Sequence, residues 1–300
     1  MKRSFVPRSL AVHDGIFHAD EVTAAALLLL CDLIDRDKIV RTRDSAKLMN
    51  CEYVCDVGGV YDPSEKLFDH HQLEYSGPLS SAGMILQYLH DEGYFSSDEY
   101  LHFRDSLVLG IDAEDNGKDF SVEGLCSFSD VIANFVPIER EVSADEENVA
   151  FFESVSFTVG HLRRMRERYL YIKSCKAIVA ERMKEGNECL IFDEHIPWQE
   201  SFFELGGENH PALFVIMPMG EHWKLRGVPP SLEEKMRVRV PLPKEWAGLL
   251  EEDFKRVTGI PGAIFCHKGR FISIWETKEE ALKALTIVLE KMRSCYGDDI

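Results

Sequence analysis

Phe68-Asp69-His70-His71-Gln72 is the segment of this 300-residue chain from which its architecture is most readily inferred. It places an aspartate and two histidines directly behind a short predicted strand, residues 66–68. Imidazole and carboxylate side chains are ligands of divalent metals such as Mn²⁺. In an α/β sheet, ligands bind at the carboxyl ends of the strands. The segment therefore predicts an α/β fold with a metal site at one edge of its sheet.

Further histidines and aspartates follow other apolar runs in the first part of the chain. His13 follows residues 9–12, Asp56 follows residues 52–55, and Asp112 follows the apolar Ile111. Taken singly, such a residue is more often a surface, hydrogen-bonded or helix-capping group than a metal ligand. Their occurrence together makes a two-metal hydrolase the leading hypothesis. The candidate metal ligands are His13, His18, Asp20, Asp56, His70 and Asp112.

A two-metal site needs a carboxylate that bridges two ions about 3.5–4 Å apart. Asp56 is expected to be the bridge, because a glycine pair follows it at the end of a strand. His13, His18 and Asp20 lie in the turn after the first predicted strand and can surround one ion. His70 and Asp112 can complete the ligands of the other ion. Mixed imidazole and carboxylate ligation favours Mn²⁺ over Mg²⁺, with Co²⁺ as a further alternative. The predicted cofactors are therefore two divalent metal ions, which would acidify a water for use as the nucleophile.

Two residues of the opening segment are predicted to act beside the metals. Asp69 is expected to orient a neighbouring histidine by a hydrogen bond, because metal-bound imidazoles usually have such a partner. His71 is expected to contact phosphoryl oxygens or to give a proton to the leaving group. The later Asp115-Asn116-Gly117 is interpreted as a turn.

Strands and helices alternate in the first half of the chain, which predicts βαβ units and a mainly parallel sheet. An apolar helix is expected from Asp20 or Glu21 to about Asp35, with further helices over residues 84–91 and 97–110. The strands of this half are expected at residues 9–12, 38–42, 52–55 and 66–68.

Three parts are predicted along the chain. Residues 1–126 form the metal-binding catalytic domain. Residues 127–185 form a helical connection, because their apolar residues recur with a helical period. Residues 186–300 form a smaller C-terminal α/β substrate domain that ends in a helix over residues 278–293. The later strands are expected at residues 188–192, 212–217, 222–226, 262–267 and 271–275.

The charge of the chain limits its partners. There are 34 Lys and Arg residues against 52 Asp and Glu residues, a net charge of −18. Such a protein repels phosphates, which argues against a long nucleic acid bound along a basic groove. A short oligonucleotide or a small nucleotide remains compatible, because metals and a few arginines attract it locally. No apolar run approaches the ~20 residues of a membrane span, so no membrane partner is expected.

The eight cysteines are scattered without a CxxC pair, which predicts reduced thiols rather than a disulfide framework or zinc ribbon. The N-terminus has no apolar signal segment before His13. We therefore expect the mature protein to begin near Met1 and to stay in the cytoplasm. The sequence leaves the oligomeric state open, with a homodimer among the alternatives.

Five ordered segments carry these polar residues: His13-Asp-Gly-Ile-Phe-His18-Ala-Asp20-Glu21, Asp56-Val-Gly-Gly-Val-Tyr-Asp62, Phe68-Asp-His-His-Gln72, Ser80-Ser-Ala-Gly83 and Ile111-Asp-Ala-Glu-Asp-Asn-Gly117. They resemble the motifs of the MYG1 (UPF0160) family, which belongs to the DHH phosphoesterase superfamily with RecJ-type exonucleases and family II pyrophosphatases. Residues 241–249 and 259–267 resemble later signatures of that family. The resemblance implies a DHH-type catalytic domain.

The resemblance also implies how the site is used. One ion would take His13, His18 and Asp56. The second ion would take Asp20, Asp56, His70 and Asp112.

The family usually has a Gly-Gly pair near the C-terminus, where this chain has Gly269-Arg-Phe-Ile-Ser-Ile274. If the pair lets backbone approach a substrate phosphate, this contact has changed here. The remaining candidates for substrate binding are Arg226, Arg239 and His267.

The leading interpretation is a metal-dependent phosphoesterase. The resemblance implies a 3′–5′ exonuclease on single-stranded RNA, and the acidic charge favours short oligonucleotides. One alternative is a small nucleotide or pyrophosphate phosphohydrolase. A second alternative is a metal-binding regulatory protein without turnover.

Overall fold

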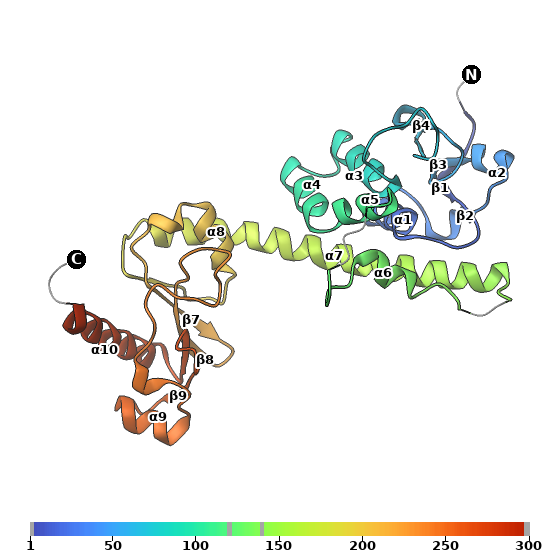
Figure 1. The fold of residues 1–300 in the computed structure, drawn as a ribbon. Coiled ribbons are helices and arrows are strands. Elements are labelled where there is room, and N and C mark those ends of the chain that lie inside the picture. The colour runs from blue at the N-terminus through green and yellow to red at the C-terminus, as the bar shows by residue number, and fades with distance from the viewer. Residues whose placement is uncertain (1–2, 119–121, 139–140, 297–300) are drawn as a thin grey trace. The chain divides into compact units, whose positions relative to one another are not determined.

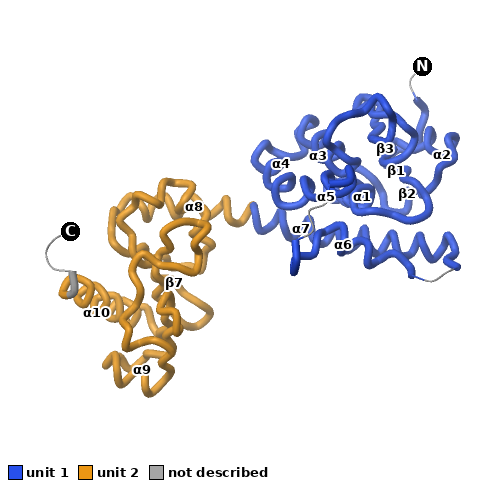
Figure 2. The backbone as a smooth tube through the Cα atoms, viewed as in Figure 1, with its two compact units in different colours: residues 1–169 blue, residues 170–300 orange. Residues whose placement is uncertain are grey.

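The computed structural model describes residues 3–118, 122–138 and 141–296, with side chains as far as Ser294. The chain forms two compact units, Met1–Tyr169 and Leu170–Ile300 (Figure 2). The boundary between them falls inside helix α7, Ala144–Met183, so this helix contributes residues to both units. The three-part division at residues 126 and 185 stays a prediction.

The first unit contains a five-stranded sheet in the order β2-β1-β3-β5-β4. All neighbouring strands are parallel except β4, which runs antiparallel to β5. The prediction of an α/β fold with a mainly parallel sheet is confirmed, and the short β4 was not predicted. The strands are β1 Val6–Val12, β2 Ile39–Arg41, β3 Cys51–Cys55, β4 Tyr61–Asp62 and β5 Leu67–Phe68.

Helix α1, Ala19–Leu30, is buried along most of its length because small and aliphatic residues cover every side of it. It ends earlier than the predicted Asp35, since Asp32 just beyond it has a left-handed backbone with φ of 55°. The other helices of this unit are α2 Ser45–Met49, α3 Ser81–Asp91, α4 Ser97–Phe103, α5 Leu109–Asp115 and α6 Phe128–Ala133 (Figure 1).

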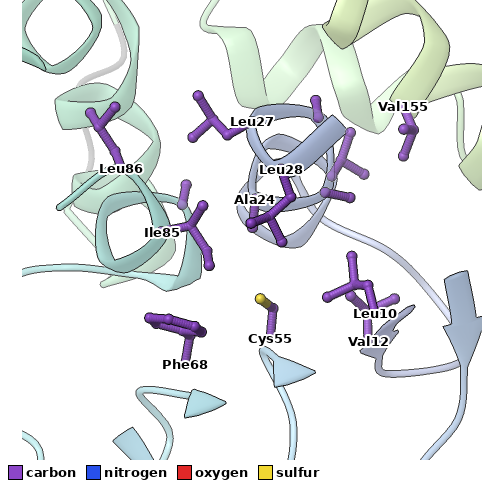
Figure 3. Close-up of a cluster of buried hydrophobic side chains, with 14 of the residues drawn as sticks. Leu10, Val12, Ala24, Leu27, Leu28, Cys55, Phe68, Ile85, Leu86 and Val155 are labelled. Atoms are coloured by element: carbon purple, nitrogen blue, oxygen red, sulfur yellow. The ribbon is translucent and has the colours of Figure 1, made fainter. Parts of the chain in front are cut away.

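The core of the first unit lies between the sheet and these helices. Figure 3 shows Leu10, Val12 and Phe68 of the strands on one side of this core. Ala24, Leu27 and Leu28 of α1, together with Ile85 and Leu86 of α3, approach them from the other side. This packing holds the carboxyl ends of β1, β3 and β5 in a fixed arrangement.

The helix predicted over residues 97–110 extends further along the chain. Helix α4 continues through a π-helical turn, Arg104–Val108, directly into α5, which ends at Asp115. Asp112 therefore lies on a helix. Phe103, Val108 and Ile111 along this helical segment pack into the core.

The second unit is smaller and contains a five-stranded sheet in the order β6-β7-β8-β10-β9. β6 and β7 are parallel, and the other pairs are antiparallel. The predicted C-terminal α/β fold is confirmed. The elements are β6 Cys189–Ile191, α8 Trp198–Glu204, β7 Phe214–Met219, β8 His222–Gly227, α9 Glu251–Thr258, β9 Ala263–Cys266, β10 Ile272–Trp275 and α10 Lys278–Tyr296.

Two separate clusters of apolar residues cover the two faces of this sheet. One cluster contains Leu225 and Trp275, and the other contains Val215 and Met217 with Trp198 of α8. Phe214 and Ile216 of β7 belong to the first cluster, so residues of β7 alternate between the two faces, as the period of a strand requires.

Two sequence-based expectations concern the whole chain. Among the described residues, no helix is both long and apolar enough to cross a membrane. The seven cysteines whose side chains are described are free thiols, and the side chain of Cys295 lies outside the described residues.

Leu28→Ala tests the packing of α1 on the sheet. Leu28 is fully buried, so we expect the substitution to lower the free energy of unfolding by about 2–5 kcal/mol. Leu101→Ala on α4 is the control, because Leu101 is 41% exposed and should change stability by less than about 1 kcal/mol. Urea unfolding in EDTA measures both, and equal losses would contradict this description of the core.

Candidate metal centre

The predicted ligands come together because three parallel strands end at the same edge of the first sheet. His13 directly follows β1, Asp56 directly follows β3, and Asp69 and His70 directly follow β5. Strands β1, β3 and β5 are neighbours in the sheet, so the residues after them are also neighbours.

Three groups of histidine and acidic side chains in this region each have their ligand atoms within 4.8 Å of one another. The groups are His13, His18, Glu21 and Asp56; Asp56, His70 and His71; and Asp20, His70 and Asp115. Asp56 belongs to the first two groups, and His70 belongs to the last two. The three groups therefore form one continuous cluster, here called the carboxylate–histidine cluster.

His13 is held in the orientation of a metal ligand. Its Nδ1 lies 2.9 Å from the carbonyl oxygen of Asp14, which can only accept, so Nδ1 carries the proton. Its Nε2 lies 3.0 Å from Oε1 of Glu21 and 3.2 Å from Oδ2 of Asp56. Burial opposes charge on this imidazole, but hydrogen bonds to Asp56 and Glu21 raise the pKa of His13 to about 10. The space around Nε2 thus attracts a cation, either a proton or a metal.

Asp56 has the position expected of a bridging carboxylate. It is 4% exposed and has a left-handed backbone with φ of 58°, a conformation that is costly for a residue with a Cβ and is typical of functional sites. Its Oδ1 has no hydrogen bond and lies 3.4 Å from Nε2 of His70. Burial would raise the pKa of Asp56, but His13 and His70 lower it to about 2. The carboxylate therefore stays ionised.

Asp20 provides the clearest test of whether a metal fits. It is 1% exposed, and neither of its carboxylate oxygens has a hydrogen-bond partner. Burial raises the pKa of Asp20, and the negative charges of Glu21, Asp56 and Asp115 raise it further. Buried carboxylates without partners are costly and are usually compensated by a cation. Imidazoles beside uncompensated carboxylates are a donor set that fits divalent metals.

Asp69 and His71 lie at the open side of the cluster. Oδ1 of Asp69 accepts from the backbone N–H of His71 at 3.0 Å and lies 2.8 Å from Nδ1 of the same ring. Its Oδ2 accepts from the N–H of Gly59 at 2.6 Å, and both Gly58 and Gly59 have positive φ. The side chain of His71 is 64% exposed. Asp69 therefore orients His71, whose Nε2 is left available to a substrate.

The structure places Asp112 apart from the cluster. Its Oδ1 accepts from the N–H of Ser80 at 3.0 Å, the hydroxyl of Ser80 at 2.7 Å and the N–H of Gly83 at 3.0 Å. It thus holds the N-terminus of α3. A Cβ added at Gly83 would lie 2.2 Å from Oδ2 of Asp112, which explains the glycine. Burial raises the pKa of Asp112 to about 6, although the hydrogen bonds from Ser80 and Gly83 oppose this shift.

Two acidic residues of the cluster were not among the predicted ligands. Glu21 is fully buried, and its carboxylate lies 3.0 Å and 2.9 Å from the backbone nitrogen of His18 as well as near His13. Asp115 lies with Oδ2 3.0 Å from Nε2 of His70. It is three residues after Asp112 on α5, so the two aspartates point to different neighbours. A helical rather than turn assignment for residues 109–115 would have identified Asp115.

Two cavities open beside the cluster. One, of about 650 Å³, is lined by residues that include His13, Asp56, His71 and Arg43. The other, of about 480 Å³, is lined by residues that include Asp20, Asp56 and His71. The cluster is therefore accessible from outside on the side of His71.

The three predicted substrate-binding residues lie in the second unit and have different surroundings. Arg239 donates to the backbone carbonyl oxygens of Gly207, His210 and Ala212 at 2.6, 2.6 and 2.9 Å, so it holds a loop in place. Arg226 and His267 instead meet at one aromatic ring, that of Phe271.

Fold and site define a two-unit α/β protein with a buried histidine and carboxylate centre at the edge of a parallel sheet. The family model described as "Uncharacterised protein family (UPF0160)" matches residues 9–289, and this chain belongs to that family, the MYG1 family. It is 53% identical over 288 residues to the MYG1 protein of Chlamydia trachomatis, covering 96% of this chain and 99% of that protein.

More distant relatives and solved structures were also found. The human MYG1 exonuclease is 30% identical over 320 residues, covering 92% of this chain and 84% of that protein. The crystal structure of RecJ in complex with Mn²⁺ from Thermus thermophilus is 12% identical. The match covers 97% of this chain and 52% of RecJ, with a TM-score of 0.28, which is too low to establish a shared fold.

Asp112→Ala and Asp115→Ala test two different roles. Asp112 is expected to stabilise the N-terminus of α3, and Asp115 is expected to bind metal. We expect Asp115→Ala to weaken Mn²⁺ binding about tenfold or more, because it removes a carboxylate from the cluster. We expect Asp112→Ala to keep the metal stoichiometry but to lose about 1–3 kcal/mol of stability, because donors at Ser80 and Gly83 become unpaired. Calorimetric titration and urea unfolding measure the two effects. Loss of metal only in Asp112→Ala would reverse the assignment.

Asp20→Asn tests whether the cluster is destabilised without a cation. In EDTA we expect the variant to be more stable than the wild type, by roughly 1–3 kcal/mol, because one buried and repelled charge is removed. Addition of Mn²⁺ should then raise the melting temperature of the wild type more than that of the variant. Asp14→Asn, at a side chain that is 57% exposed, is the control. A lower melting temperature of Asp20→Asn in EDTA would contradict the description.

Proposed function

We propose that this chain is a divalent-metal-dependent phosphodiesterase that removes nucleotides from the 3′ end of single-stranded RNA or of short oligonucleotides. The observation that carries the proposal is the carboxylate–histidine cluster, in which Asp56 and His70 each belong to two groups of ligand atoms. The name of the human relative, an exonuclease, supports a phosphodiester as substrate.

The cluster offers ligands for two ions. One position would use His13, His18, Glu21 and Asp56, and the second would use Asp20, His70 and Asp115, with Asp56 between them. The mixture of imidazole and carboxylate favours Mn²⁺ over Mg²⁺. Two such ions would polarise the phosphodiester and lower the pKa of a water molecule.

Side chains at the exposed side of the cluster would transfer the proton to the leaving group. Because the carboxylate of Asp69 accepts from Nδ1 of His71, the Nε2 of this exposed imidazole faces outward and can exchange a proton with a leaving group. The uncompensated charge of Asp20 lies on the inner side, away from solvent. Metal binding would thus take place on the buried side of the cluster, at Asp20, and proton transfer on its exposed side, at His71.

The net charge of −18 favours a short substrate. A long strand would meet repulsion over most of the protein surface, whereas a short end needs only the local attraction of the site. For the same reason a small nucleotide is the second candidate substrate, which would make the protein a phosphohydrolase of nucleotides.

His70→Ala tests the reaction and its site together. We expect the wild type, in Mn²⁺, to shorten a 5′-labelled single-stranded RNA progressively from its 3′ end. The substitution removes a side chain shared by two groups of the cluster, so activity should fall by about a hundredfold or more while the circular dichroism spectrum is unchanged. His90→Ala on α3, outside the cluster, should retain activity.

Two results would overturn the proposal. Full activity of His70→Ala with an unchanged metal content would remove the cluster from the reaction. No cleavage of RNA, oligonucleotides or nucleotides by the wild type, with metal bound, would favour a metal-binding protein without turnover.

A further inference from the structure

Lys224 and Arg226 on β8 are basic residues that lack an acidic partner. Lys224 is only 9% exposed, and among the described residues its ammonium group forms no ion pair or hydrogen bond. Nε of Arg226 is buried without a hydrogen-bond partner, and its guanidinium group donates one long hydrogen bond, 3.4 Å, to the carbonyl oxygen of Lys235. In a chain with many more acidic than basic residues, two such cations side by side are unexpected.

The two side chains lie on the same face of the second sheet. They are two residues apart on one strand, and they pair with Ile274 and Ile272 of β10 respectively. Leu225 between them faces the opposite core with Trp275. The two positive charges therefore lie side by side rather than on opposite faces.

Charge and burial make this pair costly without a ligand. Burial lowers the pKa of Lys224 to about 8, and the neighbouring Arg226 contributes to the shift. The pKa of His195 is lowered first by burial and then by the ammonium of Lys224, so a third nitrogen base lies near the pair. Buried charges of one sign without a counter-ion typically mark a site that binds the opposite charge.

Two other basic residues of this unit, Arg239 and Lys278, have partners within the protein. Arg239 donates to three backbone carbonyl oxygens, as described above. Lys278 forms an ion pair of 2.5 Å with Asp193 and lies over the ring of Trp223. Among the described residues, Lys224 and Arg226 lack such partners, which distinguishes them from Arg239 and Lys278.

Aromatic rings lie beside Arg226. The guanidinium carbon of Arg226 lies 5.9 Å from the ring centre of Phe271, and that ring lies 4.4 Å from the ring of His267. The ring of Phe265 follows at 6.2 Å from His267. All three rings are only partly buried. Cations next to partly exposed rings are typical of sites that bind a phosphate and stack the attached base.

We propose that Lys224 and Arg226 bind a phosphate group of a nucleotide or oligonucleotide, with Phe271 and His267 beside its base. The ligand class rests on the proposed function, because a nucleic acid end is the substrate proposed for the carboxylate–histidine cluster. The site itself rests on its own residues and is independent of any metal.

Binding in the absence of metal tests this site separately. The full-length wild type in EDTA is titrated against a short 5′-fluorescein-labelled single-stranded RNA, and fluorescence anisotropy is measured. Inorganic phosphate and AMP are competitors that separate recognition of phosphate alone from recognition of phosphate with a base. We expect Lys224→Met and Arg226→Gln each to weaken RNA binding about tenfold or more, since each removes a charge-assisted hydrogen bond.

Two variants control for charge and for folding. Lys278→Met removes a lysine of the same unit and should change binding by less than about twofold, because its charge is already paired. Lys224→Arg should retain binding. Lys224→Met should melt at the same temperature as the wild type or higher, because the substitution removes an unpaired buried charge. If Lys224 instead stabilised the fold, the variant would melt at a lower temperature.

The outcomes separate this site from the proposed reaction. Equal binding by wild type and Lys224→Met, or no binding by the wild type in EDTA, would overturn the phosphate site even if Mn²⁺-dependent cleavage occurs. Lysine-dependent binding without any cleavage in Mn²⁺ would support the site and overturn the proposed reaction instead.

Discussion

Electrostatic repulsion among buried carboxylates is the constraint on which the first unit depends. Asp20, Glu21 and Asp56 are each at most 4% exposed, and they lie in one cluster with Asp115. Protein hydrogen bonds compensate Glu21 and Asp56 in part, but they leave both oxygens of Asp20 without partners. A core of this kind is stable only because the surrounding sheet and helices are well packed, and it gains most from a ligand that carries positive charge.

The parallel sheet is what allows this concentration of charge. Parallel strands β1, β3 and β5 end at one edge, where helix N-termini and turns replace the apolar packing of the interior. Asp56 follows β3 in a left-handed conformation and is succeeded by two glycines with positive φ, so the chain turns sharply away after presenting its carboxylate. The backbone N–H of Gly59 in that turn then fixes Asp69, and Asp69 fixes His71.

Much of the parallel sheet and of the carboxylate–histidine cluster could be predicted from the sequence, because these features follow from local sequence patterns. The strand ends at His13 and Asp56, and the orienting role of Asp69, depend on residues within a few positions of one another. The assignment of Asp112 depended instead on knowing that residues 97–115 form one continuous helical segment, and on which side of that helix meets α3. Asp115 was missed because Asp-Asn-Gly is equally typical of a turn, and only tertiary packing places it beside the cluster.

The two units carry unbalanced buried charge of opposite sign. In the first unit the excess is negative and centred on Asp20, and in the second it is positive and centred on Lys224. Within the described parts of each unit, no partner of opposite charge neutralises Asp20 or Lys224. Each excess therefore lowers the stability of its own unit and favours a ligand of opposite charge there, a cation in the first unit and an anion in the second.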